Sequence, residues 1–121
     1  MAKILLVDDS STVRDEVAGF LRQNGLDVDT AVDGKDGLAK VKTNPGLKLV
    51  ISDVNMPNMD GLTMAEKIRG ELANSAVTII MLTTESSPAM KERGKAAGVK
   101  GWIVKPFKGE AVLETFRKLA G

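Results

Sequence analysis

This 121-residue sequence contains no cysteine and no histidine. Without cysteine, disulfides, thiolate nucleophiles and thiolate metal sites are excluded. Without histidine, the chain lacks both the usual general base and the usual zinc ligand, so Ser-His-Asp and Cys-His catalysis are excluded as well. Any chemistry must therefore use carboxylates, amines, hydroxyls and backbone groups.

Aromatic residues and long hydrophobic runs are scarce. Three Phe, one Trp and no Tyr imply an aliphatic core, and the length with 43% apolar residues suits one globular domain. The apolar run at residues 4–7 is too short for a signal peptide or a membrane span. We therefore expect a soluble cytoplasmic protein that does not contact membranes.

Charge is distributed unevenly along the chain. Residues 1–85 carry 9 Lys and Arg against 13 Asp and Glu, whereas residues 86–121 carry 8 against 3. The basic residues of the second part are spread over two helical patterns. This favours a solvated surface that faces an acidic partner over a nucleic-acid site.

Apolar stretches of strand length alternate with segments of helical periodicity. The stretches are 3–8, 26–32, 47–53, 77–83 and 101–105. This alternation predicts right-handed βαβ crossovers and a parallel sheet covered by helices on both faces, in one α/β domain. The apolar positions of four helical segments are Val13, Val17, Phe20 and Leu21; Leu38 and Val41; Ala65, Ile68 and Leu72; and Val112, Leu113, Phe116 and Leu119.

The remaining helical segment, 87–98, differs from the others. Ser87 and Pro88 are typical of a helix start. Met90 is its only large apolar side chain, and Gly94 in its interior costs about 1 kcal/mol relative to alanine. We expect this helix to be loosely held.

Polar residues end four of the five apolar stretches: Asp8 and Asp9, Asp53, Thr83 and Thr84, and Lys105. The carboxyl ends of parallel strands share one edge, where ligands bind in open α/β folds, so these side chains are expected to meet in one crevice. Singly, each has a structural explanation, since an acid or Ser10 or Ser11 can cap the first helix, threonine favours strands and lysine often ends one. Together they favour a functional site.

The crowding of carboxylates indicates what this crevice binds. Two like charges about 4 Å apart repel by about 4 kcal/mol at an effective dielectric of about 20, so three acids with one lysine must protonate in part or bind a cation. Oxygen ligands favour a hard divalent ion, and Mg²⁺ is the abundant candidate. A metal beside Lys105, Thr83 and a carboxylate nucleophile predicts phosphoryl transfer, with Asp53 as the attacking group. Pro57 cannot extend the strand, which leaves backbone carbonyls near Asn55 free to face the metal.

Four motifs, in this order, resemble the receiver domains of two-component response regulators: VDDS (7–10), DVNMPNMDG (53–61), MLTT (81–84) and KPF (105–107). The resemblance covers the whole chain. It implies the family's flavodoxin-like (βα)5 fold, a doubly wound five-stranded parallel sheet in the order 2-1-3-4-5. It also implies a single receiver domain over residues 1–121 with no output domain.

The resemblance assigns roles to these residues. Asp53 matches the phosphoacceptor, Thr83 the switch hydroxyl and Lys105 the phosphate-binding lysine. The matching Mg²⁺ ligands are Asp8, Asp9, Asp53 and the backbone carbonyl of Asn55, with Asp9 binding directly and Asp8 through water. Trp102 matches the switch aromatic, which is more often Tyr or Phe, and Asn55 and Glu85 match positions that tune dephosphorylation. The family usually has a cis bond at the position of Lys105–Pro106.

Within the family, the chain is similar to the single-domain chemotaxis type. This implies a monomeric, phosphorylation-activated switch rather than a turnover enzyme, with a histidine kinase as phosphodonor. After phosphorylation of Asp53, Thr83 moves toward the phosphate and Trp102 fills the space it leaves. The surface of segment 87–98, the last strand and the last helix then binds a partner such as a flagellar motor switch protein. Whether a phosphatase assists is left open.

Two other functions remain open on the residues. A phosphohydrolase of the haloacid-dehalogenase type shares Asp, Thr and Lys at strand ends, but it normally has a second Asp where this chain has Asn55, which cannot transfer a proton. A flavodoxin-like cofactor binder should cradle phosphate after its first strand. Segment 8–12 instead places two negative charges there.

Overall fold

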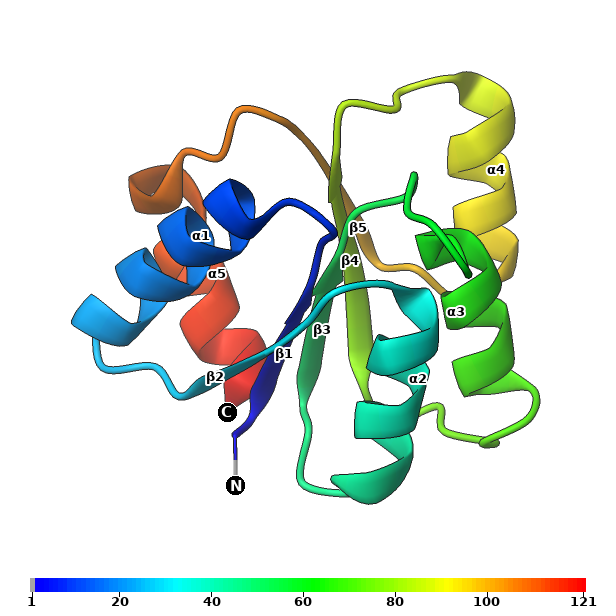
Figure 1. Ribbon diagram of the computed structural model, residues 1–121, viewed down its shortest axis with the longest axis horizontal. Helices are drawn as coiled ribbons and strands as arrows, with labels where there is room; N and C mark the ends of the chain where they lie inside the picture. The colour runs from blue at the N-terminus through cyan, green and yellow to red at the C-terminus, as the bar shows by residue number, and fades with distance from the viewer. Residues whose placement is uncertain (1) are drawn as a thin grey trace.

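The computed structural model describes residues 2–121, in which strands and helices alternate along the chain (Figure 1). The strands are β1 (Ile4–Val7), β2 (Val28–Ala31), β3 (Leu49–Ser52), β4 (Thr78–Thr83) and β5 (Gly101–Val104). The helices are α1 (Ser11–Gln23), α2 (Gly34–Thr43), α3 (Gly61–Arg69), α4 (Pro88–Ala96) and α5 (Gly109–Ala120). No helix among the described residues is long and apolar enough to cross a membrane.

The strands form one parallel sheet in the order β2-β1-β3-β4-β5, which confirms the predicted fold. All five predicted strands are present, each shorter than its apolar stretch by one to three residues. The sheet is covered on both faces, with α1 and α5 on one side and α2, α3 and α4 on the other (Figure 1).

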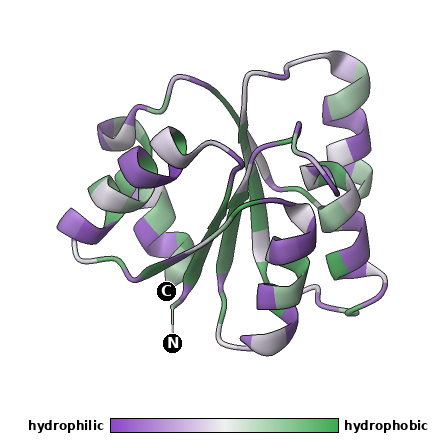
Figure 2. Ribbon diagram, in the orientation of Figure 1, coloured by the Kyte–Doolittle hydropathy of each residue, from purple (hydrophilic) through white to green (hydrophobic). Residues whose placement is uncertain are grey.

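The core consists of two apolar layers, one on each face of the sheet, because alternate strand residues point to opposite sides. In β1, Leu5 and Val7 belong to the layer under α2, α3 and α4, whereas Ile4 and Leu6 belong to the layer under α1 and α5. Figure 2 shows the apolar character of the strands between the more polar helices. Phe116 is the one fully buried aromatic side chain in the described residues.

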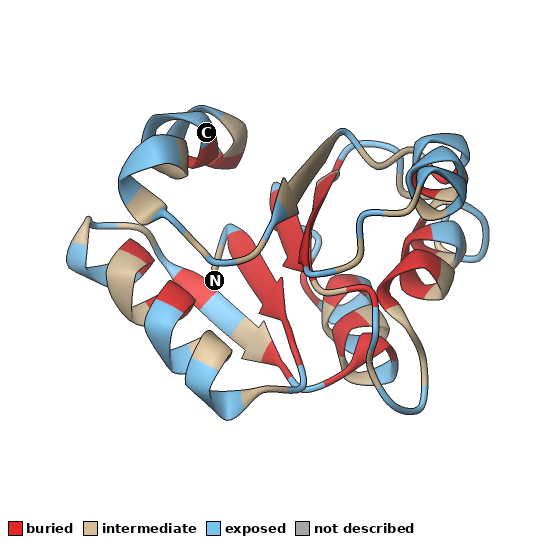
Figure 3. Cartoon of the chain, turned by 90° about the horizontal axis from the view of Figure 1, so that it is seen from above, coloured by how far each residue is buried: buried red, intermediate tan, exposed pale blue. Residues whose placement is uncertain are grey.

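Burial decreases from the centre of the sheet toward its edges (Figure 3). Every residue of β1 and β3 is buried, whereas β5 has no buried residue and β2 is buried only at its two ends. The central strands therefore supply the most rigid support for side chains at the sheet edge.

Four of the five helices begin at a side-chain cap. The caps are Ser10, Asp33, Asp60 and Ser87, each accepting a hydrogen bond from a backbone N–H in the first turn. Ser10 caps α1, which leaves the carboxylates of Asp8 and Asp9 available for other contacts. Pro88 occupies the first turn of α4, as the sequence predicts.

The third helix is shorter than the sequence predicts. The apolar pattern extends the helix to Leu72, but α3 ends at Arg69 and Leu72 lies in the following turn, where it still packs against the core. The Arg69 guanidinium donates to the carbonyls of Asn74 and Val77, both at 2.8 Å, and so stabilises the turn that replaces the last helical residues.

Candidate functional site

The sheet register places two acids side by side. Val7 is paired with Ser52, so the next residues along β1 and β3, Asp8 and Asp53, leave the sheet at the same level. The Asp53 backbone N–H donates to the Val7 carbonyl at 3.0 Å, which extends the ladder up to the acid itself. Because both strands are fully buried, the two carboxylates are held in fixed positions.

Lys105 joins these acids from the other half of the sheet. Thr83 is paired with Val104, so Lys105 follows directly at the end of β5. Its Nζ lies 3.0 Å from Asp8 Oδ2 and 3.0 Å from Asp53 Oδ2. The Asp8 side chain is 2% exposed, that of Asp53 12% and that of Lys105 18%. Charges this well shielded from water interact much more strongly than a surface pair.

The ion pairs stabilise the protonated form of Lys105. Burial of the ammonium opposes its charged form, but hydrogen bonds and the negative charges of Asp8 and Asp53 outweigh burial, so the pKa of Lys105 lies above its usual value. Lys105 is therefore a permanent positive charge between the two acids at neutral pH.

The remaining oxygens of the two acids are also fixed by hydrogen bonds. Asp8 Oδ1 accepts from the Ser10 N–H at 2.9 Å, and Asp53 Oδ1 accepts from the Val54 N–H at 2.7 Å. Each of these two carboxylates therefore has a partner on both oxygens. This arrangement orients one edge of the Asp53 carboxylate toward Lys105.

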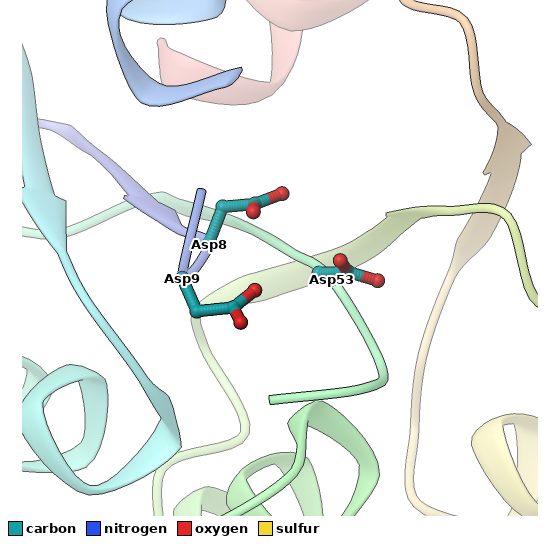
Figure 4. Close-up of side chains that lie close together, drawn as sticks. All are labelled: Asp8, Asp9 and Asp53. Carbon is teal, nitrogen blue, oxygen red and sulfur yellow. The ribbon is translucent and has the colours of Figure 1, made fainter. Parts of the chain in front are cut away.

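Asp9 completes a group of three acids. Asp8, Asp9 and Asp53 each offer an oxygen, and these oxygens lie within 4.8 Å of one another. Figure 4 shows the three carboxyl groups gathered at the ends of β1 and β3. Unlike the other two, Asp9 is exposed. Three acids with one lysine leave a net negative charge, and an all-oxygen donor set suits Mg²⁺, so the residues fit the predicted ion.

The loop from Asp53 to the start of α3 folds back against its own beginning. The Gly61 N–H donates to the Val54 carbonyl at 2.8 Å. A Cβ at Gly61 would lie 2.0 Å from the Asp53 carbonyl oxygen, so no other residue fits without moving the loop. Asn55 lies exposed within this loop.

A second contact, which the sequence does not predict, holds the same loop from outside. The buried Asp33 carboxylate accepts from the Asp36 N–H at 2.8 Å and from Asn58 Nδ2 at 2.7 Å, and these bonds lower the pKa of Asp33. Asn58 has φ of 67°, a left-handed conformation that asparagine tolerates. The Asp-Gly pair at 33–34 is typical of a helix start, but nothing in the sequence indicates that Asp33 also contacts Asn58.

Thr83, Glu85 and Trp102 form a chain of hydrogen bonds beside the acids. Thr83 is fully buried at the end of β4, and its Oγ1 accepts from the Glu85 N–H at 3.1 Å. The Glu85 carbonyl accepts from Trp102 Nε1 at 2.8 Å. Thr83 ends the strand that neighbours β3, but within residues 2–121 no hydrogen bond joins it to Asp53.

The Lys105–Pro106 peptide is cis, as the resemblance predicts. Phe107 then packs edge-to-face on Phe20 of α1, with ring centroids 5.8 Å apart. This contact anchors the loop that carries Lys105 to the opposite side of the sheet from Trp102.

Comparison with known proteins identifies relatives that cover nearly the whole chain. The family model described as "Response regulator receiver domain" matches residues 4–117. "Chemotaxis protein CheY1" of Helicobacter pylori is 38% identical over 120 residues, which cover 98% of this chain and 97% of that protein. "Chemotaxis protein CheY" of Treponema pallidum is 40% identical over 114 residues, which cover 93% of this chain and 78% of that protein. The solved structure of Vibrio cholerae chemotaxis protein CheY4 is 44% identical to this chain and has a TM-score of 0.88. The match covers 98% of this chain and 98% of that chain.

Proposed function

This chain belongs to the response regulator receiver domain family of two-component systems, and we propose that it is a phosphorylation-activated switch in which Asp53 accepts the phosphoryl group. The observation that carries the proposal is the ion-paired Asp53 carboxylate, at the end of a fully buried strand and within a group of three acids. Its relatives named for chemotaxis support a role in that process.

In the proposed reaction, a carboxylate oxygen of Asp53 forms a bond to the phosphorus of a phosphohistidine on a histidine kinase. The phosphorus–nitrogen bond breaks, and its electron pair leaves with the imidazole nitrogen. Lys105, whose Nζ already lies 3.0 Å from Asp53 Oδ2, neutralises charge on the phosphoryl oxygens. Positioning and charge neutralisation supply most of the catalysis in such transfers.

The proposed Mg²⁺ ligands are Asp8, Asp9, Asp53 and the backbone carbonyl of Asn55, with Asp9 binding directly and Asp8 through water. When bound, the ion supplies positive charge that the single lysine does not provide to the three acids and the incoming phosphoryl group. The exposure of Asp9, beside two shielded acids, supports a solvent-accessible position for the ion.

The proposed signal passes from Thr83 to Trp102. When Thr83 turns toward the phosphoryl group, its Oγ1 ceases to accept from the Glu85 N–H, and the hydrogen bond from Trp102 Nε1 to the Glu85 carbonyl changes with it. Asn55 and Glu85 are proposed to tune dephosphorylation. Because Asn55 cannot act as a general base, the aspartyl phosphate persists instead of being hydrolysed quickly. A lasting aspartyl phosphate suits a switch and does not suit a phosphohydrolase.

The surface formed by α4, β5 and α5 is the proposed docking site for the output partner. A hollow of about 420 Å³ between α4 and β5 is lined by Trp102 and by Lys91, Lys95 and Lys100. Three lysines beside an aromatic side chain suit an acidic segment of a partner, for which a flagellar motor switch protein is the candidate. We also propose that the chain works as a cytoplasmic monomer and that residues 1–121 form one receiver domain.

The test is incubation with Mg²⁺ and a small phosphodonor such as acetyl phosphate, followed by intact mass measurement. We expect one phosphoryl adduct, no adduct for Asp53→Asn, and no adduct for the wild type when the metal is chelated. As a matched control, Asp29→Asn removes an exposed acid at the far edge of the sheet and should leave the adduct unchanged. An equal adduct on Asp53→Asn would contradict the proposal.

A further inference from the structure

We propose that Gly94 is a positioning residue for the switch: the missing side chain at this point of α4 lets the Trp102 indole lie against the helix, shielded and bonded to the Glu85 carbonyl. The effect on the switch rests on the proposed function, because it takes Trp102 as the reporter of phosphorylation. The contact between Gly94 and Trp102 is seen in the packing of α4 against β5.

Gly94 is the only buried residue of α4 and lies in the interior of the helix, where glycine is unfavourable. A Cβ built on Gly94 would lie 2.9 Å from Cζ3 of Trp102 and 3.4 Å from Cδ2 of Leu62. Carbon atoms pack favourably at about 3.5–4.0 Å, so the contact with Leu62 is tolerable and the one with Trp102 is not. The indole is thus the side chain that meets any group added at this position.

Trp102 has freedom to move in response. Its side chain is half-buried, and it packs at the margin of the apolar layer rather than inside it. Its polar anchor is one hydrogen bond, from Nε1 to the Glu85 carbonyl at 2.8 Å. An alanine at position 94 therefore separates the indole from α4 and weakens the bond to Glu85.

The size of residue 94 consequently sets the balance between a shielded and an exposed indole. Glu85 is also bonded to Thr83, so a displaced indole alters the same hydrogen-bonded chain that the phosphoryl group alters from the other end. Two events acting on one element are energetically coupled. Gly94 thus biases the switch from a helix that carries none of the acids of the site.

The first experiment measures emission and acrylamide quenching of Trp102, the only tryptophan, without a phosphodonor. We expect Gly94→Ala to shift the emission to longer wavelength and to make the indole more accessible to acrylamide than in the wild type. Gly19→Ala is the matched control. It also removes a glycine from a helix interior, but a Cβ there meets no atom within 4 Å, so its spectra should match the wild type. Wild-type spectra for Gly94→Ala would overturn the proposal.

A second measurement decides the matter if Gly94→Ala is poorly folded. In a Trp102→Phe background, which lacks the Cζ3 atom, the same alanine should raise the urea midpoint of unfolding, as Gly19→Ala does, because only the gain in helix propensity remains. When Trp102 is present, Gly94→Ala should raise the urea midpoint of unfolding by less, or should lower it. An equal rise in both backgrounds would show that Trp102 does not contact residue 94, and the proposal would be wrong.

The third measurement is the response to Mg²⁺ and acetyl phosphate. The emission change on phosphorylation should be larger in Gly94→Ala than in Gly19→Ala or the wild type, because the indole starts from a more exposed position before it fills the space that Thr83 leaves. Equal responses in all three would contradict the proposed bias. Failure of the proposed function looks different: no adduct forms on Asp53 in any variant, while the first two measurements still decide how Gly94 positions Trp102.

Discussion

The centre of the sheet and its β5 edge are built in contrasting ways. All eight residues of β1 and β3 are buried, and each strand ends directly at an acid of the site. On the other side, β5 has no buried residue, and α4 buries only a glycine. One region is held by dense apolar packing, whereas the other is held by a few specific contacts.

The difference in packing suits the two regions to different parts of the proposed function. Under the proposed function, the carboxylates hold an ion and a phosphoryl group, which requires the fixed positions that the buried central strands provide. A surface that must change shape needs a small free-energy difference between two arrangements, and lightly packed elements provide that. Lys105 and the Thr83–Glu85–Trp102 chain connect the two regions.

The largest expected effect comes from removing apolar side chains in each region. Ile51→Ala, in the middle of β3, should lower the free energy of unfolding by about 2–5 kcal/mol, because the cavity it leaves is fully enclosed. Ile103→Ala in β5 should cost about 1–2 kcal/mol, since that side chain is only partly buried. Urea denaturation measures both. Equal losses would contradict the contrast in packing.

Metal binding should stabilise the centre of the sheet. At ten times its dissociation constant, Mg²⁺ should raise the free energy of unfolding by about 1.4 kcal/mol, because it binds the folded chain and has no site in the unfolded one. Asp9→Asn should reduce this gain, and Asp29→Asn should leave it unchanged. Thermal unfolding with and without the ion provides the measurement, and a wild-type gain retained in full by Asp9→Asn would rule out this acid as a ligand.

A smaller effect is expected from the ion pair that attaches α4 to α3. Arg93 donates to Glu66 at 2.9 and 3.1 Å, and these hydrogen bonds lower the pKa of Glu66. A lowered carboxyl pKa stabilises the fold above the usual value for glutamate, and this stabilisation is lost as the pH falls through the lowered pKa. Both side chains are well exposed, so the contribution should be about 0.2–1 kcal/mol.

The check is the difference in unfolding free energy between the wild type and Glu66→Gln, measured at neutral pH and at about pH 3, below the usual glutamate pKa. The difference should shrink at the acid end. Glu71→Gln removes the partner of Lys67 within α3 and serves as the control, because that pair does not reach α4. If only this control lost stability, the attachment of α4 would not depend on Glu66.

Much of the fold and the acidic group could be predicted because both follow from local pattern and parallel topology. Apolar stretches give the strands, and their shared edge brings Asp8, Asp9, Asp53 and Lys105 together, as the structure confirms. Leu72 was placed wrongly in the third helical segment, since α3 ends at Arg69 and the turn that follows depends on what the Arg69 side chain reaches. The individual roles of the site residues stay predictions.

Contacts between distant segments account for what the sequence does not disclose. Gly94 reads as a weakness of its helix, yet its neighbour across the packing is Trp102, from another element. Asp33 reads as a helix cap, and only the folded chain shows that it also holds Asn58 beside the site. In both cases, the residue has a role in its own helix and also makes a tertiary contact with another element.

The most direct test of this account is amide hydrogen exchange of the whole chain with and without Mg²⁺ and acetyl phosphate, read by segment. We expect the exchange of α4, β5 and the loop that contains Glu85 to change on phosphorylation, while β1 and β3 keep their slow exchange. A fully modified Asp53 with unchanged exchange in α4 and β5, or with loosened β1 and β3, would contradict the division between a fixed centre and a responsive edge.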